Sequence, residues 1–179
     1  MTPALAKADR ERFRESMARL AATVHILTAR HEGHRYGMTI TAASSLSADP
    51  MSIIVSVHRG TATHEAIVRS RRLCLNMLSP GHDELAIRFS GALGHRGDER
   101  FEAGDWICEG NAPPVLQGAA AALQCDLVDR HSFGTHDVML CHVGEICLGL
   151  DQTALVYANR RYGTVRLMAN PQFQDAQGE

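Results

Sequence analysis

The chain has 179 residues, of which 45% are hydrophobic and 21% are charged, and its formal net charge is −2. This length favours a single domain, residues 1–179, and the composition is that of a soluble globular protein with a sizeable core. The small net charge gives no electrostatic footprint for nucleic acid or an anionic membrane. No apolar run approaches the ~20 residues of a membrane span.

The cysteines are odd in number and show no Cys-x-x-Cys spacing; they are Cys74, Cys108, Cys125, Cys141 and Cys147. This argues against a disulfide framework or a zinc knuckle and suits a reducing compartment. The first residues lack the apolar segment of a signal peptide. We therefore expect a cytoplasmic protein.

An amphipathic helix is predicted over residues 4–21, because Phe13, Met17 and Leu20 recur at helical spacing. We expect its apolar side to pack on the domain or on a partner subunit. The domain proper is predicted over residues 22–167, and a polar, frayed tail over 170–179.

A hairpin is predicted next, in which residues 23–29 lead through a polar turn into a strand that starts at Gly37. Along this strand an apolar face, Met38, Ile40 and Ala42, alternates with a small, partly hydroxyl-bearing face, Thr39, Thr41 and Ala43, and a loop that contains Ser44 and Ser45 follows. Few of these side chains are bulky, so a flat ligand could lie close to the backbone. The alternative is an ordinary half-buried strand that runs into a serine-rich turn.

Residues 51–58 alternate as a strand and lead into a helix that opens near residue 61. Thr61 or Thr63 can serve as its N-cap. Free amides at the helix start, the two threonines and Arg59 form a candidate phosphate cradle. A plain capped helix is the alternative.

The second half of the chain is predicted to be rich in strands. A strand over 73–78 is followed by a helix with Ser79 as N-cap and Pro80 at its first position, ending near Gly91 and carrying Leu85, Ala86 and Phe89 on one side. Residues 95–114 are rich in loops. Long strands are predicted over 119–130 and 137–149, with a connection over 131–136, and a short strand near 154–157. Because regular β-α-β alternation is absent, a mainly β antiparallel barrel with peripheral helices fits best.

Motifs for several other chemistries are absent. The sequence has no Gly-x-Ser-x-Gly and no His-Glu-x-x-His, and Gly91, Gly94 and Gly97 do not have the spacing of the dinucleotide fingerprint. The histidines lack compact ligand spacing, so no metal site is predicted. We also predict no catalytic nucleophile.

The order of these segments resembles that of the short-chain flavin reductases, the reductase components of two-component flavin-dependent monooxygenases. The matching segments are residues 36–47, 49–50, 55–57, 61–67, 75–78, 88–91, 100–101 and 134–136. The resemblance implies an FMN-binding split barrel, usually a homodimer, with flavin near the subunit interface. It further implies reduction of FMN or FAD by NADH or NADPH and delivery of reduced flavin to a partner oxygenase.

In that family the flavin carries the chemistry, so the protein need only bind and orient the cofactors and exclude competing reactions. The absence of a nucleophile and of a metal set agrees with this. A non-catalytic flavin-binding or electron-carrier protein on the same barrel is the alternative function.

The resemblance also implies site residues. Those expected at the flavin are Met38, Thr39, Thr41, Ala42, Ser44, Ser45, Ser56, Thr61, Thr63, His64, Phe89 and Ser90, to which we add Arg59 for its charge. His136 and Tyr162 are expected at the nicotinamide cofactor. The sequence departs from the family pattern at Thr135, where many members have aspartate, and at His58-Arg59, where many have a turn containing asparagine.

Overall fold

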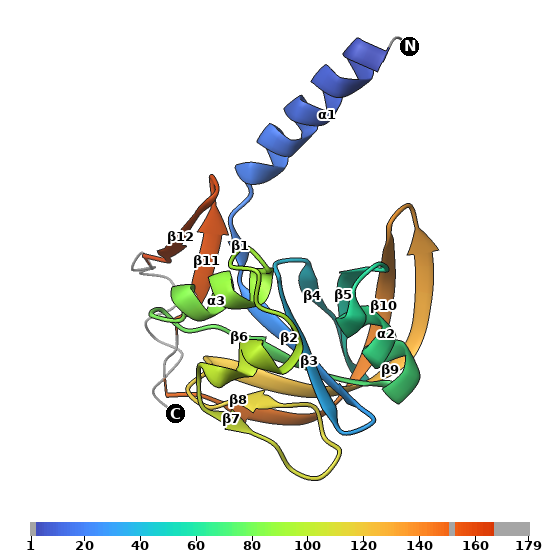
Figure 1. Cartoon of the computed structure of the whole chain (residues 1–179), viewed down its shortest axis with the longest axis vertical. Coiled ribbons are helices and arrows are strands. Elements are labelled where there is room, and N and C mark those ends of the chain that lie inside the picture. The colour runs from blue at the N-terminus through green and yellow to red at the C-terminus, as the bar shows by residue number, and fades with distance from the viewer. Residues whose placement is uncertain (1–2, 151–152, 167–179) are drawn as a thin grey trace.

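One antiparallel sheet of seven strands forms the centre of the molecule (Figure 1). In chain order its strands are β2 (His25–His31), β3 (His34–Ile40), β4 (Ala43–Ala48), β5 (Met51–His58), β6 (Arg72–Met77), β9 (Ala121–Phe133) and β10 (His136–Leu148). In space the order is β3-β2-β6-β9-β10-β5-β4. The computed structural model describes residues 3–150 and 153–166, so the predicted tail at 170–179 lies outside the described residues.

The sheet curls because its two edge strands are neighbours in the chain. β3 and β4 lie at opposite edges, yet only Thr41 and Ala42 separate them. A two-residue link cannot span a flat sheet of seven strands, whose neighbours are about 4.8 Å apart. The sheet therefore bends round until its edges approach, as a split barrel does. The predicted mainly β fold with peripheral helices is confirmed.

The inside of the curled sheet is apolar, and three short helices cover it or its edge. Leu27, Val55, Val57, Leu75 and Met139 are at most 2% exposed and form the main core. The helix α2 (Ala62–Ser70) packs on this core, whereas α3 (Asp83–Ser90) and the 3₁₀ helix η1 (Gly97–Glu102) pack on β3. A second apolar cluster lies there, and it includes Val24, Ile26, Phe89 and Phe101.

Two small sheets complete the described part of the chain. One contains β1 (Ala22–Thr23), β11 (Leu155–Ala158) and β12 (Arg161–Thr164), and the other pairs β7 (Trp106–Ile107) with β8 (Val115–Leu116). None of the helices in the described residues has both the length and the apolar character needed to cross a membrane.

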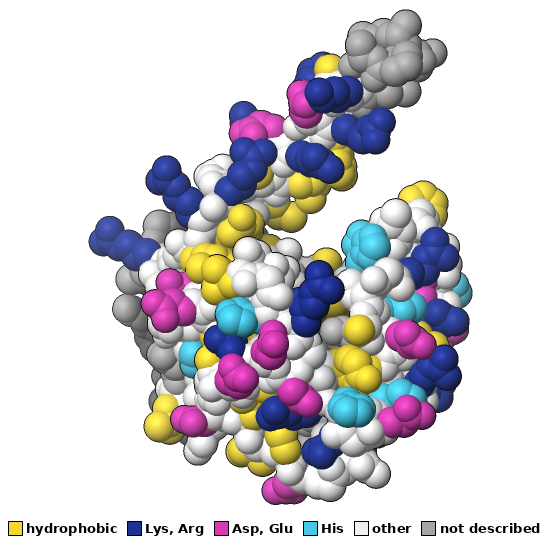
Figure 2. All heavy atoms as spheres, viewed as in Figure 1, with side chains coloured by type: hydrophobic (Ala, Val, Ile, Leu, Met, Phe, Trp, Pro, Cys, Tyr) yellow, Lys and Arg dark blue, Asp and Glu magenta, His cyan; other side chains and the backbone are white. Residues whose placement is uncertain are grey.

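The N-terminal helix α1 (Pro3–Ala18) projects away from the sheet (Figure 1). The helix ends at Ala18, not at residue 21 as predicted, so Leu20 lies just beyond it. Phe13, Met17 and Leu20, the residues of the predicted apolar side, are 65%, 47% and 59% exposed. Figure 2 shows apolar atoms along one side of this projecting helix. The apolar side therefore does not pack on its own domain, and packing on a partner subunit stays a prediction.

The predicted start of the helix after β6 is wrong. α3 begins at Asp83, not at Pro80, because Gly81 has a φ of 93° and breaks the helical path. Ser79 does not cap a helix: its hydroxyl donates to the Gly118 carbonyl at 2.7 Å, and its amide donates to Nδ1 of His82 at 3.2 Å. The predicted helix end at Gly91 is confirmed, since this residue adopts the left-handed conformation at the C-cap.

Near the C-terminal end the turn between the two long strands is shorter than predicted, and there is one strand more than predicted. The connection between β9 and β10 contains only Gly134 and Thr135, whereas the sequence predicted a connection over 131–136. β12 was not predicted. Asn159 and Arg160 both have positive φ values, of 49° and 59°, which is the geometry of a tight two-residue hairpin.

Candidate functional site

A groove of about 280 Å³ lies beside the link from β3 to β4 and the outer face of β5. It is lined by Thr41, Ala42, Ala43, Ser44, Ile54, Val55, Ser56 and Val138. The alternation of β5 explains its position: Ile53, Val55 and Val57 point into the core, which leaves Ile54 and Ser56 on the other face. Four predicted flavin residues, Thr41, Ala42, Ser44 and Ser56, therefore meet in one groove.

A second cavity, of about 490 Å³, also lies beside β4 and β5. Thr41 and Ser44 line it as well as the groove, and Ser45 and His25 also face it. His25 is only 4% exposed, and burial lowers its pKa to about 4, so its ring is neutral at pH 7. Ser45, another predicted flavin residue, thus lines this cavity and not the groove.

Two imidazole rings stand just beyond one end of the groove. Ser56 of β5 pairs with Val138 of β10, and two residues further on His58 pairs with His136. The rings of His58 and His136 meet edge to face, with their centroids 5.1 Å apart. His136, predicted to contact the nicotinamide cofactor, therefore shares a sheet face with the groove.

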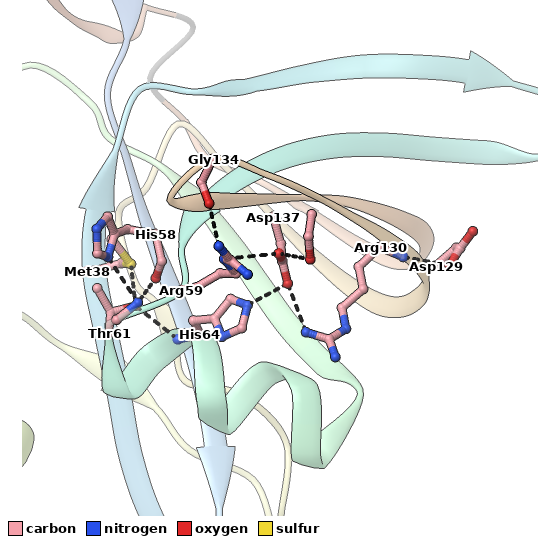
Figure 3. A network of polar contacts seen from close by, with 11 residues as sticks. Met38, His58, Arg59, Thr61, His64, Asp129, Arg130, Gly134 and Asp137 are labelled. Carbon is pink, nitrogen blue, oxygen red and sulfur yellow. Dashed lines mark hydrogen bonds and ion pairs between the residues drawn. The ribbon is translucent and has the colours of Figure 1, made fainter.

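The start of α2 lies beside this end of the sheet. Thr61 is the N-cap, and its hydroxyl accepts from the amide of His64 at 3.2 Å. The same hydroxyl lies 2.9 Å from the carbonyl of His58 and 3.7 Å from Sδ of Met38 (Figure 3). Of the two predicted caps Thr61 is confirmed, whereas Thr63 lies inside the helix and is 4% exposed.

A buried carboxylate, Asp137, joins α2 to the β9–β10 hairpin (Figure 3). His64 Nε2 and Arg130 Nη1 each lie 2.8 Å from Oδ2, and the hydroxyl of Ser132 donates to Oδ1 at 2.7 Å. Nε of Arg59 is 3.8 Å from Oδ1. The hydrogen bond from Ser132, followed by those from His64 and Arg130, holds the pKa of Asp137 at about 2, against the opposing effect of burial.

Sequence reasoning missed this network, although one signal was present. Asp137 has the same strand parity as Met139 and Cys141, which point into the core. A carboxylate on the apolar side of a strand needs buried partners, because an unpaired buried charge is costly. Its partners come from α2, from the loop that precedes α2 and from β9, and neither spacing nor motif links α2 and its loop to β9 in the sequence.

Several other predicted residues lie away from the groove within one chain. The ring of Phe89 is fully buried against Phe101 and Trp106, and the hydroxyl of Ser90 donates to the Ile87 carbonyl at 2.7 Å. The hydroxyl of Thr39 donates to the Ala86 carbonyl at 2.6 Å and so joins β3 to α3.

Tyr162 lies on β12, with its ring centroid 5.1 Å from that of Tyr157, and burial raises its pKa. Figure 1 places β12 and the β9–β10 turn on opposite sides of the molecule, so Tyr162 and His136 do not meet within one chain. Within the described residues, no group of three or more His, Cys, Asp or Glu side chains could hold a metal ion.

Comparison with known proteins gives consistent matches. A family model described as "Flavin reductase like domain" matches residues 17–166. The chain is 39% identical over 150 residues to FMN reductase (NADH) RutF 2 of Methylorubrum extorquens (strain PA1), which covers 84% of this chain and 86% of that protein.

Comparison with solved structures gives proteins of the same fold. The flavin reductase domain protein from Arthrobacter sp. FB24 has a TM-score of 0.80 at 30% identity, covering 90% of this chain and 99% of that one. Nitrilotriacetate monooxygenase component B from Mycobacterium thermoresistibile has a TM-score of 0.84 at 24% identity and covers 97% of each chain, which is a likeness in fold.

Proposed function

The chain belongs to the family of flavin reductase like domains, and we propose that it uses NADH to reduce FMN held along the groove beside β4 and β5. It is an oxidoreductase whose substrates are a nicotinamide cofactor and a flavin. The observation that supports this placement is the groove itself, whose walls are small side chains and the hydroxyls of Thr41, Ser44 and Ser56. Such walls let a flat ring system lie against the backbone, and the hydroxyls and nearby amides can bond its polar edge.

The phosphate of FMN fits the start of α2. The first-turn amides of a helix lack partners within the helix and favour an anion. Arg59 lies next to this helix start, with 48% of its side chain exposed. Thr61 has its hydroxyl at the same place, whereas buried Thr63 can contribute its amide. Arg59, Thr61 and Thr63 therefore form the proposed phosphate cradle.

In this reaction the chain's own residues bind the flavin and NADH and orient them. When bound, the flavin supplies the acceptor for a hydride from the nicotinamide ring, so no protein nucleophile is needed. His136 would donate a hydrogen bond to the amide or phosphates of NADH, and its position on the same sheet face as the groove supports this role. The groove positions one ring system against the other, and this positioning is the main contribution of the protein.

The experiment that tests this function is a cofactor matrix. Purified protein is mixed with NADH or NADPH and with FMN, FAD or riboflavin, and loss of reduced nicotinamide is followed by absorbance. We expect turnover with NADH and FMN. The cradle predicts that FMN binds roughly ten- to a hundredfold more tightly than riboflavin, the effect of a charged phosphate contact. Flavin binding without NADH oxidation would instead favour an electron carrier.

We also propose that the reduced flavin is passed to an oxygenase. A protein of the same fold is named as a monooxygenase component, which supports this role. We further propose a cytoplasmic homodimer. The exposed apolar side of α1 supports the dimer, and the five unpaired cysteines support the cytoplasm. Mixing the protein with a flavin-dependent oxygenase, NADH and FMN tests the transfer, since product should form only when both proteins are present.

A further inference from the structure

We propose that Asp137 is a positioning residue that fixes Arg59 at the phosphate cradle. This inference rests on the proposed function, because it concerns how the FMN phosphate is held. Asp137 follows His136 directly in β10, but its side chain points to the opposite face, toward α2 (Figure 3). It is fully buried and so is not expected to touch the ligand itself.

Asp137 connects three separate elements. His64 reaches it from the first turn of α2, Arg130 and Ser132 from β9, and Arg59 from the loop that precedes α2. These contacts hold the start of α2 against the hairpin. A carboxylate with this many partners is rigid, because each partner fixes one of its lone pairs in direction.

Arg59 is held from two sides. Its Nε lies 3.8 Å from Oδ1 of Asp137, and its Nη2 donates to the carbonyl of Gly134. Its backbone amide also donates to the Thr135 carbonyl at 3.0 Å. An arginine side chain otherwise samples many rotamers, and this freedom would be lost on binding a phosphate. Asp137 removes part of that freedom in advance.

Arg130 prevents the carboxylate from cancelling the charge of Arg59. Two guanidinium groups share one carboxylate, and the side chains of Arg59 and Arg130 are 48% and 45% exposed. The neighbouring Asp129 is 59% exposed, accepts from the Arg130 amide and lies near His131, so solvent screens its charge. Positive charge therefore remains at the cradle.

Charge and positioning predict opposite effects when Asp137 is replaced. Asp137→Asn removes a negative charge close to the cradle, so a purely electrostatic effect would tighten the binding of the FMN anion. If Asp137 acts by positioning, the same change releases Arg59 and weakens FMN binding. A merely structural role would weaken FMN and riboflavin alike, because riboflavin lacks the phosphate but shares the ring system.

The test compares FMN and riboflavin dissociation constants by titration of flavin fluorescence, for the wild type and Asp137→Asn. We expect the value for FMN to rise roughly tenfold and the value for riboflavin to stay within about twofold. The KM for FMN should rise with it, while kcat stays close to the wild-type value. Asp126→Asn is the matched control, since Asp126 is an exposed aspartate on β9 whose ion-pair partner is Arg72.

A second variant covers the case in which Asp137→Asn does not fold. Ser132→Ala removes the 2.7 Å hydrogen bond to Oδ1 and leaves every charge in place. We expect a several-fold loss of FMN affinity with riboflavin unchanged. In a folded variant, unchanged or tighter FMN binding overturns the inference, as does equal weakening of both flavins. If the wild type itself does not bind FMN more tightly than riboflavin, the proposed phosphate cradle is wrong, and the role of Asp137 is wrong as well.

Discussion

His136 stands at the first position of β10, directly after the two-residue turn. The proposed hydrogen bond from its ring to NADH would contribute roughly 0.5–3 kcal/mol, depending on charge. His136→Ala should therefore raise the KM for NADH several-fold or more and leave FMN affinity almost unchanged. Steady-state kinetics with varied NADH, together with FMN titration, measures both effects. His34→Ala, at an exposed histidine of the β2–β3 hairpin, is the control.

The alternative role of His136 is to stabilise the hairpin. Nδ1 of His136 lies 2.9 Å from the hydroxyl of Thr135, and its ring contacts His58. In that case His136→Ala would lower thermal stability and affect the flavin and nicotinamide steps alike. Normal NADH kinetics in a folded variant would contradict the cofactor contact.

Gly37 is required by close packing, not by its backbone conformation. A Cβ at this position would lie 2.6 Å and 2.9 Å from two ring atoms of Phe89, whose ring is fully buried. Gly37→Ala should cost about 1–3 kcal/mol and lower the Tm by several degrees, because neither β3 nor the core can yield freely. Gly163→Ala on β12 is the control, since no atom lies within 4 Å of its added Cβ. Equal melting temperatures for the two variants would contradict this account.

At the residue scale, the family resemblance named Thr41, Ala42, Ser44 and Ser56, and the structure brings these four together in one groove. Alternation along residues 51–58 could be read directly and separates Ser56 from the core face of that strand. Burial of the Phe89 ring and pairing of His64 with Asp137 depend on which elements pack together. No local pattern encodes those contacts, so reasoning from the sequence could not supply them.

Among the elements, α2 has a cap whose contribution can be measured. The hydroxyl of Thr61 accepts from the His64 amide, and Thr61→Ala should cost about 1 kcal/mol of stability. Because the hydroxyl also belongs to the proposed cradle, FMN affinity should fall more than riboflavin affinity. Thr61→Ser should restore most of both, since serine caps equally well. Thermal unfolding and flavin titration of the three proteins provide the measurements, and a Thr61→Ala protein as stable as the wild type would contradict the cap.

Element ends were less predictable than element types. Strand β5 was predicted at Met51–His58, as observed, because its alternation is regular. Ser79-Pro80 has the composition of a helix start, but Gly81 and the bond from Ser79 to Gly118 override that local preference. The turn at Asn159-Arg160 was missed because arginine rarely adopts a positive φ, so its sequence carries little turn signal.

At the scale of the whole molecule, α1 is the part that a single chain leaves incomplete. An isolated helix of this length is marginal in water and is normally stabilised by packing of its apolar side. The described contacts of α1 with the rest of the chain include an Asn159 bond to its last residue and the Glu15–Arg160 ion pair. Neither covers Phe13 or Met17, which supports a second copy as the cover.

Met17→Asp should therefore weaken the dimer. It places a charge on the apolar side of α1, where a partner subunit would have to desolvate it, at a cost of several kcal/mol. We expect sedimentation at micromolar concentration to show a dimer for the wild type and mainly monomer for this variant. Arg14→Asp, which introduces the same side chain on the exposed polar side of the helix, should remain dimeric. A wild type that sediments as a monomer and still reduces flavin at full rate would refute the dimer. A Met17→Asp dimer as stable as the wild type would refute the role of α1, because the buried charge would then have no measurable cost.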